Sequence, residues 1–195
     1  EFTLYSSDNN GEKNIKIRLA YKAVSLDGEG TAESPYLIGT ARELLGFATV
    51  LNSSINSPYR TAHFKLKGNI DLNFLSFEPI GKNSVYAFRG VFDGDGHEIK
   101  ALSVADTESM YVGLFGCLTD GEIKNLRVSG EVFSPEQSAY VGGIAGAVTG
   151  NSRIENCVNY CSVSASRKSS AGGICGYYRK SDDIGYEWTD NAVIF

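Results

Sequence analysis

The chain has 195 residues, with 18 Lys and Arg against 23 Asp and Glu, and therefore a formal net charge of −5. This acidic balance argues against nucleic acid or an anionic membrane surface as the main partner, because both are bound through clustered positive charge. A content of 4 prolines and 42% hydrophobic residues excludes a disordered or collagen-like chain. The 22 glycines and 11% aromatic residues favour many short strands joined by tight turns.

The N-terminal segment has the pattern of a β-hairpin. Residues 2–5 and 15–21 alternate apolar and polar with period two, and Asn10-Gly11 between them is a strong turn signal. Residues 1–27 are therefore predicted to form a hairpin, either packed beside the next element or remaining from a preceding domain. Residues 28–195 are predicted to form the main domain. The start at Glu1-Phe2, without methionine, predicts a processed or truncated chain.

One helix is predicted, over about residues 40–52. Thr40 as N-cap and Glu43 three residues later have capping-box spacing. Apolar residues then follow at helical spacing: Ala41, Leu44, Leu45, Ala48 and Leu51. Because this helix precedes the repeats described next, we expect it to cover the N-terminal end of their core.

The rest of the chain contains internal repeats. One glycine-rich phrase occurs at 111–116, 141–146 and 171–176, so its glycines recur every 30 residues. A second phrase at 123–128 returns at 154–159, an offset of 31, and an earlier version at 99–104 precedes it by 24 residues. Each unit has room for short strands and turns but none for a crossover helix. A single unit of this size cannot bury its apolar face, so the units must stack.

These repeats predict an all-β fold, a right-handed parallel β-helix with an N-terminal capping α-helix and an N-terminal β-hairpin. Equivalent residues of successive turns should then lie above one another, about 4.8 Å apart. Side chains alternate along a strand, so Lys100 and Lys124, which directly follow Ile99 and Ile123, should point to solvent. The expected inner ladders are Ile99/Ile123/Ile154, Leu102/Leu126/Cys157 and Leu114/Ile144/Ile174, and the expected outer ladder is Lys100/Lys124/Glu155.

The four cysteines occupy positions that are apolar in other repeats. Cys157 takes the place of Leu126, and Cys175 that of Ala145 and Phe115. The pattern favours free, buried thiols at Cys117, Cys157, Cys161 and Cys175 over a disulfide, with Cys157–Cys175 as the pair to test first.

No metal site or cofactor is predicted. The segment 93–96, Asp-Gly-Asp-Gly, favours a turn between strands over a calcium loop, because Val104 stands where an EF-hand needs its bidentate acid. His97-Glu98 begins like a zinc-protease helix, but the place of the second histidine is Ala101. With 2 histidines in the chain, a two-histidine zinc site is disfavoured.

The acidic residues do not predict an enzyme. Glycan-cleaving β-helices need acids or bases from adjacent turns in one groove. Here Glu122 aligns with Arg153 and Glu131 aligns with Ser162, so solvated outer charges are the favoured interpretation. Catalytic residues are therefore predicted to be absent, and a glycan-cleaving β-helix is the less favoured alternative.

Aromatic residues supply the one candidate ligand site. Tyr177, Tyr178, Tyr186 and Trp188 cluster after the last repeat, among charged residues. Their rings could stack on sugar faces, which would make the chain a carbohydrate-binding module, or they could seal the C-terminal end of the stack.

In their order along the chain, several phrases resemble the GLUG-motif β-helix repeat proteins of bacterial cell surfaces. They are residues 28–38 leading into the helix, 66–72, 79–81, Phe-Asp-Gly-Asp-Gly-His at 92–97, and the glycine repeats up to residue 176. Some immunoglobulin-cleaving metallopeptidases carry similar repeats, but this chain lacks their catalytic motif. The resemblance implies a secreted or cell-surface module with an adhesion or spacer role in a larger protein. Its expected partners are a glycan or a protein of a host or bacterial surface, with no nucleic acid and no membrane insertion by this chain.

Overall fold

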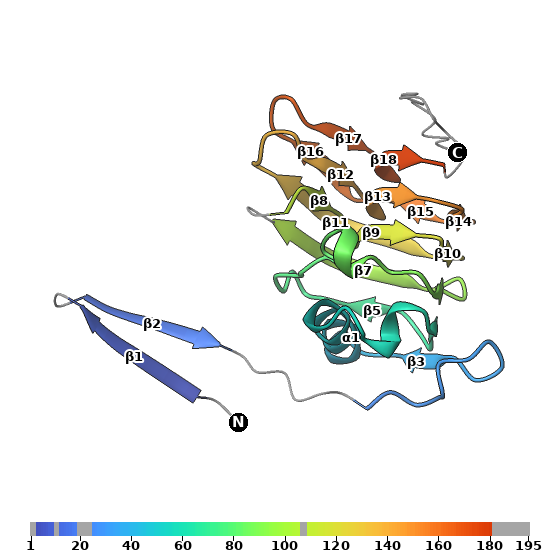
Figure 1. The fold of residues 1–195 in the computed structure, drawn as a ribbon, viewed down its shortest axis with the longest axis horizontal. Helices are drawn as coiled ribbons and strands as arrows, with labels where there is room; N and C mark the ends of the chain where they lie inside the picture. The colour runs from blue at the N-terminus through green and yellow to red at the C-terminus, as the bar shows by residue number, and fades with distance from the viewer. Residues whose placement is uncertain (1–2, 10–11, 19–24, 106–108, 181–195) are drawn as a thin grey trace.

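The computed structural model describes residues 3–9, 12–18, 25–105 and 109–180. In this part of the chain the structure is mostly β, with four parallel sheets, one antiparallel strand pair and one α-helix (Figure 1). Two short 3-10 helices, η1 (Pro58–Arg60) and η2 (Ser84–Tyr86), lie in the connections. The prediction of a mostly β fold with one helix is confirmed.

The N-terminal strands pair as the hairpin prediction requires. Strand β1 (Thr3–Asn9) runs antiparallel to β2 (Glu12–Arg18), and Asn9 lies opposite Glu12. The predicted turn at residues 10–11 lies outside the described residues. The division of the chain after residue 27 stays a prediction.

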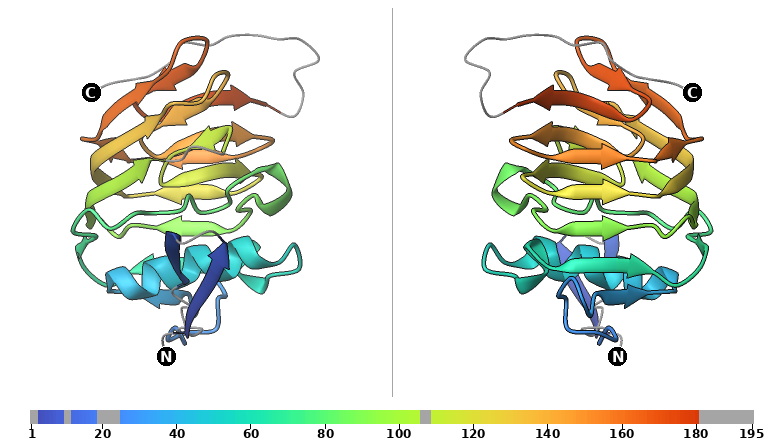
Figure 2. Two further views of the ribbon diagram at one scale, coloured as in Figure 1. Left: turned by 90° about the vertical axis from the view of Figure 1, so that its left-hand side faces the viewer. Right: turned by 90° about the vertical axis from the view of Figure 1, so that its right-hand side faces the viewer.

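Helix α1 (Ala41–Ser53) begins at the predicted capping box. The Glu43 amide donates to Thr40 Oγ1 over 3.2 Å, and the Thr40 amide donates to Glu43 Oε2 over 3.0 Å. Phe47 on the buried side lies with its ring 4.0 Å from that of Phe64 and 5.9 Å from that of Phe88. The helix therefore packs onto the N-terminal end of the apolar core, across the sheets (Figures 1 and 2). Of the helices in the described part, none combines the length and apolar character that crossing a bilayer requires.

Two of the sheets have five strands each. Sheet I has the order β3-β4-β6-β10-β14, and sheet II has the order β5-β7-β11-β15, with β16 also pairing with β11. The strands of sheet I are β3 (Tyr36–Ile38), β4 (His63–Leu66), β6 (Val91–Asp93), β10 (Glu122–Lys124) and β14 (Arg153–Glu155). Those of sheet II are β5 (Ile70–Asp71), β7 (Glu98–Ala105), β11 (Arg127–Ser134), β15 (Val158–Asn159) and β16 (Ser162–Ala165).

The other two sheets have three strands each and hold the glycine-rich phrases. Sheet III is β8 (Tyr111–Val112), β12 (Tyr140–Gly142) and β17 (Ser170–Gly172). Sheet IV is β9 (Phe115–Thr119), β13 (Ala145–Thr149) and β18 (Cys175–Arg179). From β8 onward the chain visits sheets III, IV, I and II in that order and then begins again. Each pass lies on the previous one, as the colour sequence in Figure 2 shows.

Equivalent residues of successive passes align across the sheets. In sheet I, Phe92, Ile123 and Ile154 lie opposite one another, and Phe92 and Ile123 have no exposed surface. Between sheets III and IV, the Ile144 amide donates to the Ile174 carbonyl over 3.0 Å. The predicted pairings Ile123/Ile154, Leu126/Cys157 and Leu114/Ile144/Ile174 are therefore confirmed by the register.

The predicted position of the earliest phrase, 99–104, is wrong. Ile99 pairs with Ile70 and Val128 in sheet II, and it does not align with Ile123. Likewise Leu102 lies opposite Gly130, and Lys100 lies opposite Asp71. Aligned residues of sheet I are 28 to 31 residues apart, from Phe64 through 92 and 123 to 154. An offset of 24 is too short for one complete pass, so residues 99–104 belong to the next sheet.

Two of the periodic glycines, Gly146 and Gly176, stand where the backbones of sheets III and IV approach each other closely. A Cβ atom on Gly146 would collide with the backbone nitrogen of Val112 in the preceding pass. A Cβ atom on Gly176 would collide in the same way with the nitrogen of Val141. At these two positions, one repeat apart, the close approach leaves no room for a side chain.

The turns between sheets I and II carry a row of hydrogen-bonded side chains. Asn125 and Asn156 have positive φ values of 53° and 51°, a conformation that asparagine tolerates better than most residues. The Asn156 side-chain amide donates to Asn125 Oδ1 over 3.3 Å, and that of Asn125 donates to Asp93 Oδ1 over 3.0 Å. The Asp95 amide also donates to Asp93 Oδ1, over 2.8 Å. The segment 93–96 is thus a turn between strands, as predicted.

Candidate functional site

The structure describes two of the four aromatic residues that the sequence indicated as a ligand site. Tyr177 and Tyr178 are adjacent in β18 and therefore point to opposite faces of sheet IV. Tyr178 is 40% exposed and lies opposite Val148. Tyr186 and Trp188 lie outside the described residues. A ligand site formed by these four aromatics stays a prediction.

Tyr177 belongs to a row of three tyrosines that the sequence reasoning missed. Tyr111 and Tyr140 lie in register in sheet III, with their rings stacked at 5.8 Å and 12°. The ring of Tyr177 lies 4.8 Å from that of Tyr140, tilted by 44°. We call these three residues the tyrosine row. The available signal was a tyrosine directly before Val-Gly in two successive repeats.

The tyrosine row covers small side chains on the outer face of sheet IV. Tyr111 and Tyr177 pack against the buried residues Ala87, Cys117 and Ala147. Burial raises the pKa of the Tyr111 hydroxyl, with smaller contributions from Cys117 and the other two tyrosines. The rings of Tyr111 and Tyr140 are stacked on each other. The tyrosine row is therefore better described as packed side chains than as an open surface on which a sugar ring could stack.

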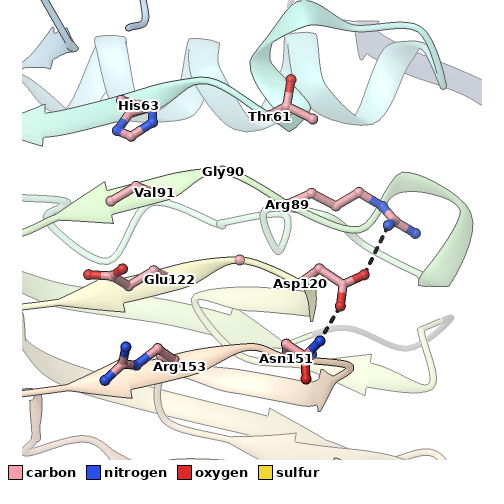
Figure 3. Close-up of a pocket in the computed structure, with 10 residues that line it drawn as sticks. Thr61, His63, Arg89, Gly90, Val91, Asp120, Glu122, Asn151 and Arg153 are labelled. Atoms are coloured by element: carbon pink, nitrogen blue, oxygen red, sulfur yellow. Dashed lines mark hydrogen bonds and ion pairs between the residues drawn. The ribbon is translucent and has the colours of Figure 1, made fainter. Parts of the chain in front are cut away.

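A shallow polar hollow lies along one edge of sheet I (Figure 3). Its volume is about 200 Å³. It is built from residues at or just before the starts of β4, β6, β10 and β14, so each of these neighbouring strands contributes equivalent positions. The lining residues are Thr61, His63, Arg89, Gly90, Val91, Asp120, Gly121, Glu122, Asn151 and Arg153.

The side chains of this hollow form two rows across the strands. His63, Val91, Glu122 and Arg153 lie in register at the starts of β4, β6, β10 and β14. Two residues before the start of each of these strands lies the second row: Thr61, Arg89, Asp120 and Asn151. Arg89 Nη1 lies 3.4 Å from Asp120 Oδ2, and the backbone amide of Asn151 donates to Asp120 Oδ1 over 3.0 Å (Figure 3).

A second polar hollow, of about 330 Å³, adjoins the first at Asp120. It lies toward sheet IV, where Thr119, Thr149 and Arg179 are in register. The hydroxyls of Thr119 and Thr149 lie 2.8 Å apart. Its lining residues are Thr119, Asp120, Thr149, Gly150, Arg179 and Lys180. We call the two hollows together the polar groove.

The acids of the polar groove are paired with nearby cations. Lys124 Nζ lies 2.8 Å from Glu122 Oε1, and this hydrogen bond raises the pKa of Lys124. Glu122 also lies opposite Arg153 across the strand pair, and Arg153 pairs with Glu155 on its own strand. The arrangement can therefore bind hydroxyl and anionic groups of a ligand through hydrogen bonds and charge.

The four cysteines are free. Burial raises the thiol pKa to about 12 for Cys117 and Cys161 and to about 11 for Cys157, and it also raises that of Cys175. Because the thiolate is the reactive form, none of these groups is activated as a nucleophile. Within the described ranges, His, Cys, Asp and Glu side chains do not gather in threes to hold a metal ion.

No family model matches the sequence. The chain is 34% identical over 139 residues to a protein of Evansella cellulosilytica provisionally named Gly-rich membrane protein, covering 68% of this chain and 15% of that protein. It is 33% identical over 144 residues to halomucin of Haloquadratum walsbyi, covering 65% of this chain and 2% of halomucin. This chain thus spans only a small part of the length of either relative.

Among solved structures, the chain is similar to a protein from Bacteroides ovatus provisionally described as an immunoglobulin A1 protease. The sequence identity is 22% and the TM-score is 0.47. The superposition covers 79% of this chain and 65% of the other.

Proposed function

We propose that the chain is a non-catalytic module of a bacterial surface or secreted protein, and that its stacked passes form a right-handed parallel β-helix. The observation that carries the proposal is the register: Phe92, Ile123 and Ile154 lie on one another in successive passes. Four parallel sheets visited in a constant order are what such a helix requires. The right hand follows from the strong preference of parallel crossover connections.

The relatives support a surface location. One is named a membrane protein and the other halomucin, and each is much longer than this chain. A stacked module with one continuous apolar core can form one segment of such a long protein, because each pass needs contact only with the neighbouring passes. The resemblance to GLUG-motif surface proteins leads to the same location.

Within a surface protein, a spacer or adhesion role fits best. Backbone hydrogen bonds join successive passes along the stack, so the module should resist bending and compression. The outward positions of sheet I alternate in charge, with Lys65, Asp93, Lys124 and Glu155 in one register row. Such a surface stays hydrated, which is the property that a spacer between a cell and its surroundings needs.

The surface location can be tested on intact cells of the source organism. Antibodies against this chain should label unpermeabilised cells or detect the protein in the culture medium, and protease added outside should remove the cell-bound signal. A cytoplasmic marker protein serves as the control. Labelling that requires permeabilisation, with no protein in the medium, would contradict the proposal.

Absence of catalysis is part of the proposal. The ion pairs of Asp120 with Arg89 and of Glu122 with Lys124 support it, because both acids of the polar groove are already engaged by cations of the chain itself. Incubation with uronate and neutral polysaccharides should release no reducing sugar or unsaturated product. Turnover that is lost in both Asp120→Asn and Glu122→Gln would instead establish a glycan-cleaving enzyme.

A carbohydrate-binding module is the second candidate, because Tyr178, in the last repeat, is a 40% exposed aromatic residue. In this role Tyr177, Tyr178, Tyr186 and Trp188 would stack on sugar rings. A glycan array with the native chain, Tyr178→Ala and Trp188→Ala tests it directly. Signals that are absent, or that both substitutions leave unchanged, would remove the aromatic site from consideration.

A further inference from the structure

The polar groove has a charge opposite to that of the whole chain. Its lining includes Arg89, Arg153, Arg179 and Lys180 against Asp120 and Glu122, so four formal positive charges face two negative ones, a local balance of +2. The chain as a whole carries −5. The net negative charge already keeps the chain soluble, so solubility does not explain why positive charge gathers in this groove.

Arg60, which does not line the groove, adds a second positive charge near Arg89. Arg60 sits beside Arg89, and its carbonyl accepts the Arg89 amide over 2.7 Å. Burial lowers the pKa of Arg60, and the charge of Arg89 lowers it further. Arg89 in turn reaches only one oxygen of Asp120, at 3.4 Å, and its side chain is 41% exposed. The guanidinium of Arg89 therefore retains donors for an external anion.

At the other end, Arg153 and Arg179 are similarly available. The side chain of Arg153 is 68% exposed and pairs only along its own strand with Glu155. Arg179 is exposed at the end of β18 and lines the second hollow with Lys180. Planar guanidinium groups bind carboxylate and sulfate groups through paired hydrogen bonds, which makes them suited to anionic ligands.

The direction of the groove favours a polymer over a small molecule. Its equivalent positions come from successive passes, so it extends along the stack with a step of about 4.8 Å per strand. One sugar unit of an extended glycan is similar in length to this step. The groove is also open and shallow, whereas sites for small molecules are enclosed cavities.

We propose that the polar groove binds a stretch of an anionic polysaccharide along the stack, with Arg89, Arg153 and Arg179 contacting its carboxylate or sulfate groups. Asp120, Asn151 and the threonine hydroxyls would then meet sugar hydroxyls. None of these residues belongs to the predicted aromatic site. A spacer role does not depend on it, so a failure of glycan binding would leave the surface location standing.

The test measures binding of the full chain to immobilised polygalacturonate, heparin and neutral dextran at low and physiological salt. We expect binding to at least one anionic glycan, none to dextran, and an affinity that falls as salt rises. Polygalacturonate carries carboxylate groups alone and heparin carries both carboxylate and sulfate groups, so binding to heparin without binding to polygalacturonate would identify sulfate as the required group. Single-stranded DNA of similar length serves as a further polyanion, and equal binding to it would contradict recognition of a glycan.

Charge variants locate the site. The double variant Arg153→Ala and Arg179→Ala should weaken binding about tenfold or more, because two arginine contacts are lost. The matched control, Arg42→Ala with Lys100→Ala, removes the same charge from exposed positions outside the groove and should change affinity less than about twofold. Equal losses in both double variants, or no binding to either anionic glycan, would overturn the proposal. Thermal unfolding of each variant verifies that it is folded.

Discussion

At the scale of single residues, the glycines of the repeat differ sharply in what surrounds them. Gly146 faces backbone atoms of the preceding pass, whereas an added Cβ atom on Gly173 would have no neighbour within 4 Å. The two glycines occur in the same phrase of successive repeats, so the sequence alone gives them equal weight. The structure separates a glycine that packing requires from one that it tolerates.

This difference predicts unequal effects of alanine. Gly146→Ala should lower the free energy of unfolding by about 3 kcal/mol, because the new methyl group overlaps the backbone and the sheets must move apart. Gly173→Ala should change it by less than about 1 kcal/mol, since the space is free. Urea unfolding followed by circular dichroism measures both. Similar values for the two variants would contradict the close approach of sheets III and IV.

The buried thiols give stability a pH dependence above neutrality. The pKa of Cys117 is raised from 9.0 to about 12, so between these values the unfolded state releases a proton that the folded state keeps. The contribution is fully present below pH 9 and is lost as pH rises toward 12. Cys117→Ala should therefore make the fall in stability over this range less steep.

Alanine suits this test because Ala87 and Ala147 already surround Cys117. Melting temperatures of the native chain and of Cys117→Ala at pH 8 and at pH 10.5 provide the measurement. An identical pH response in the two proteins would show that Cys117 forms a thiolate as easily in the folded state as in the unfolded one.

At the scale of secondary-structure elements, the sequence predicted those whose signals are local. The capping box fixed the start of α1, and the Asp-Gly turn after β6 was recognised from its own residues. Alignment of Ile123 with Ile154 followed because both phrases lie one full pass apart. The phrase at 99–104 was misplaced because similar inward residues occur in every sheet, so likeness alone does not identify the sheet.

The candidate sites were harder to predict for a related reason. The row Thr61, Arg89, Asp120 and Asn151 contains four residue types, so no repetition in the sequence marks it as a row. Tyr111, Tyr140 and Tyr177 come from two different sheets and meet only where those sheets approach each other. Both features depend on which passes become neighbours, which only the fold determines.

The strands of the last described pass should be less protected than their equivalents. Ile154 in β14 and Ile174 before β18 are only half-buried, whereas Ile123 and Ile144 one pass earlier are fully buried. Hydrogen exchange followed by mass spectrometry should therefore find faster exchange in β14 and β18 than in β10 and β13. Slower exchange in β14 and β18 would mean that another part of the protein covers this end.

At the scale of the whole molecule, one arrangement explains the apolar core, the periodic glycines and the polar groove. Because the chain returns to the same sheet every 28 to 31 residues, equivalent positions become neighbours in space. Inward rows then join into one core, which α1 covers at its N-terminal end. Outward rows become continuous strips of side chains, and the polar groove is one of them.

The distance between outward residues of neighbouring passes tests this arrangement most directly. Nitroxide labels at Lys124→Cys and Glu155→Cys, in a chain with its four native cysteines replaced by alanine, would sit on directly opposed strand positions about 4.8 Å apart at the backbone. The account predicts strong dipolar broadening of the electron paramagnetic resonance spectrum for this pair. It predicts clearly weaker broadening for Lys100→Cys with Lys124→Cys, which lie in different sheets. Stronger broadening for the second pair than for the first would contradict the stacking of passes in this register.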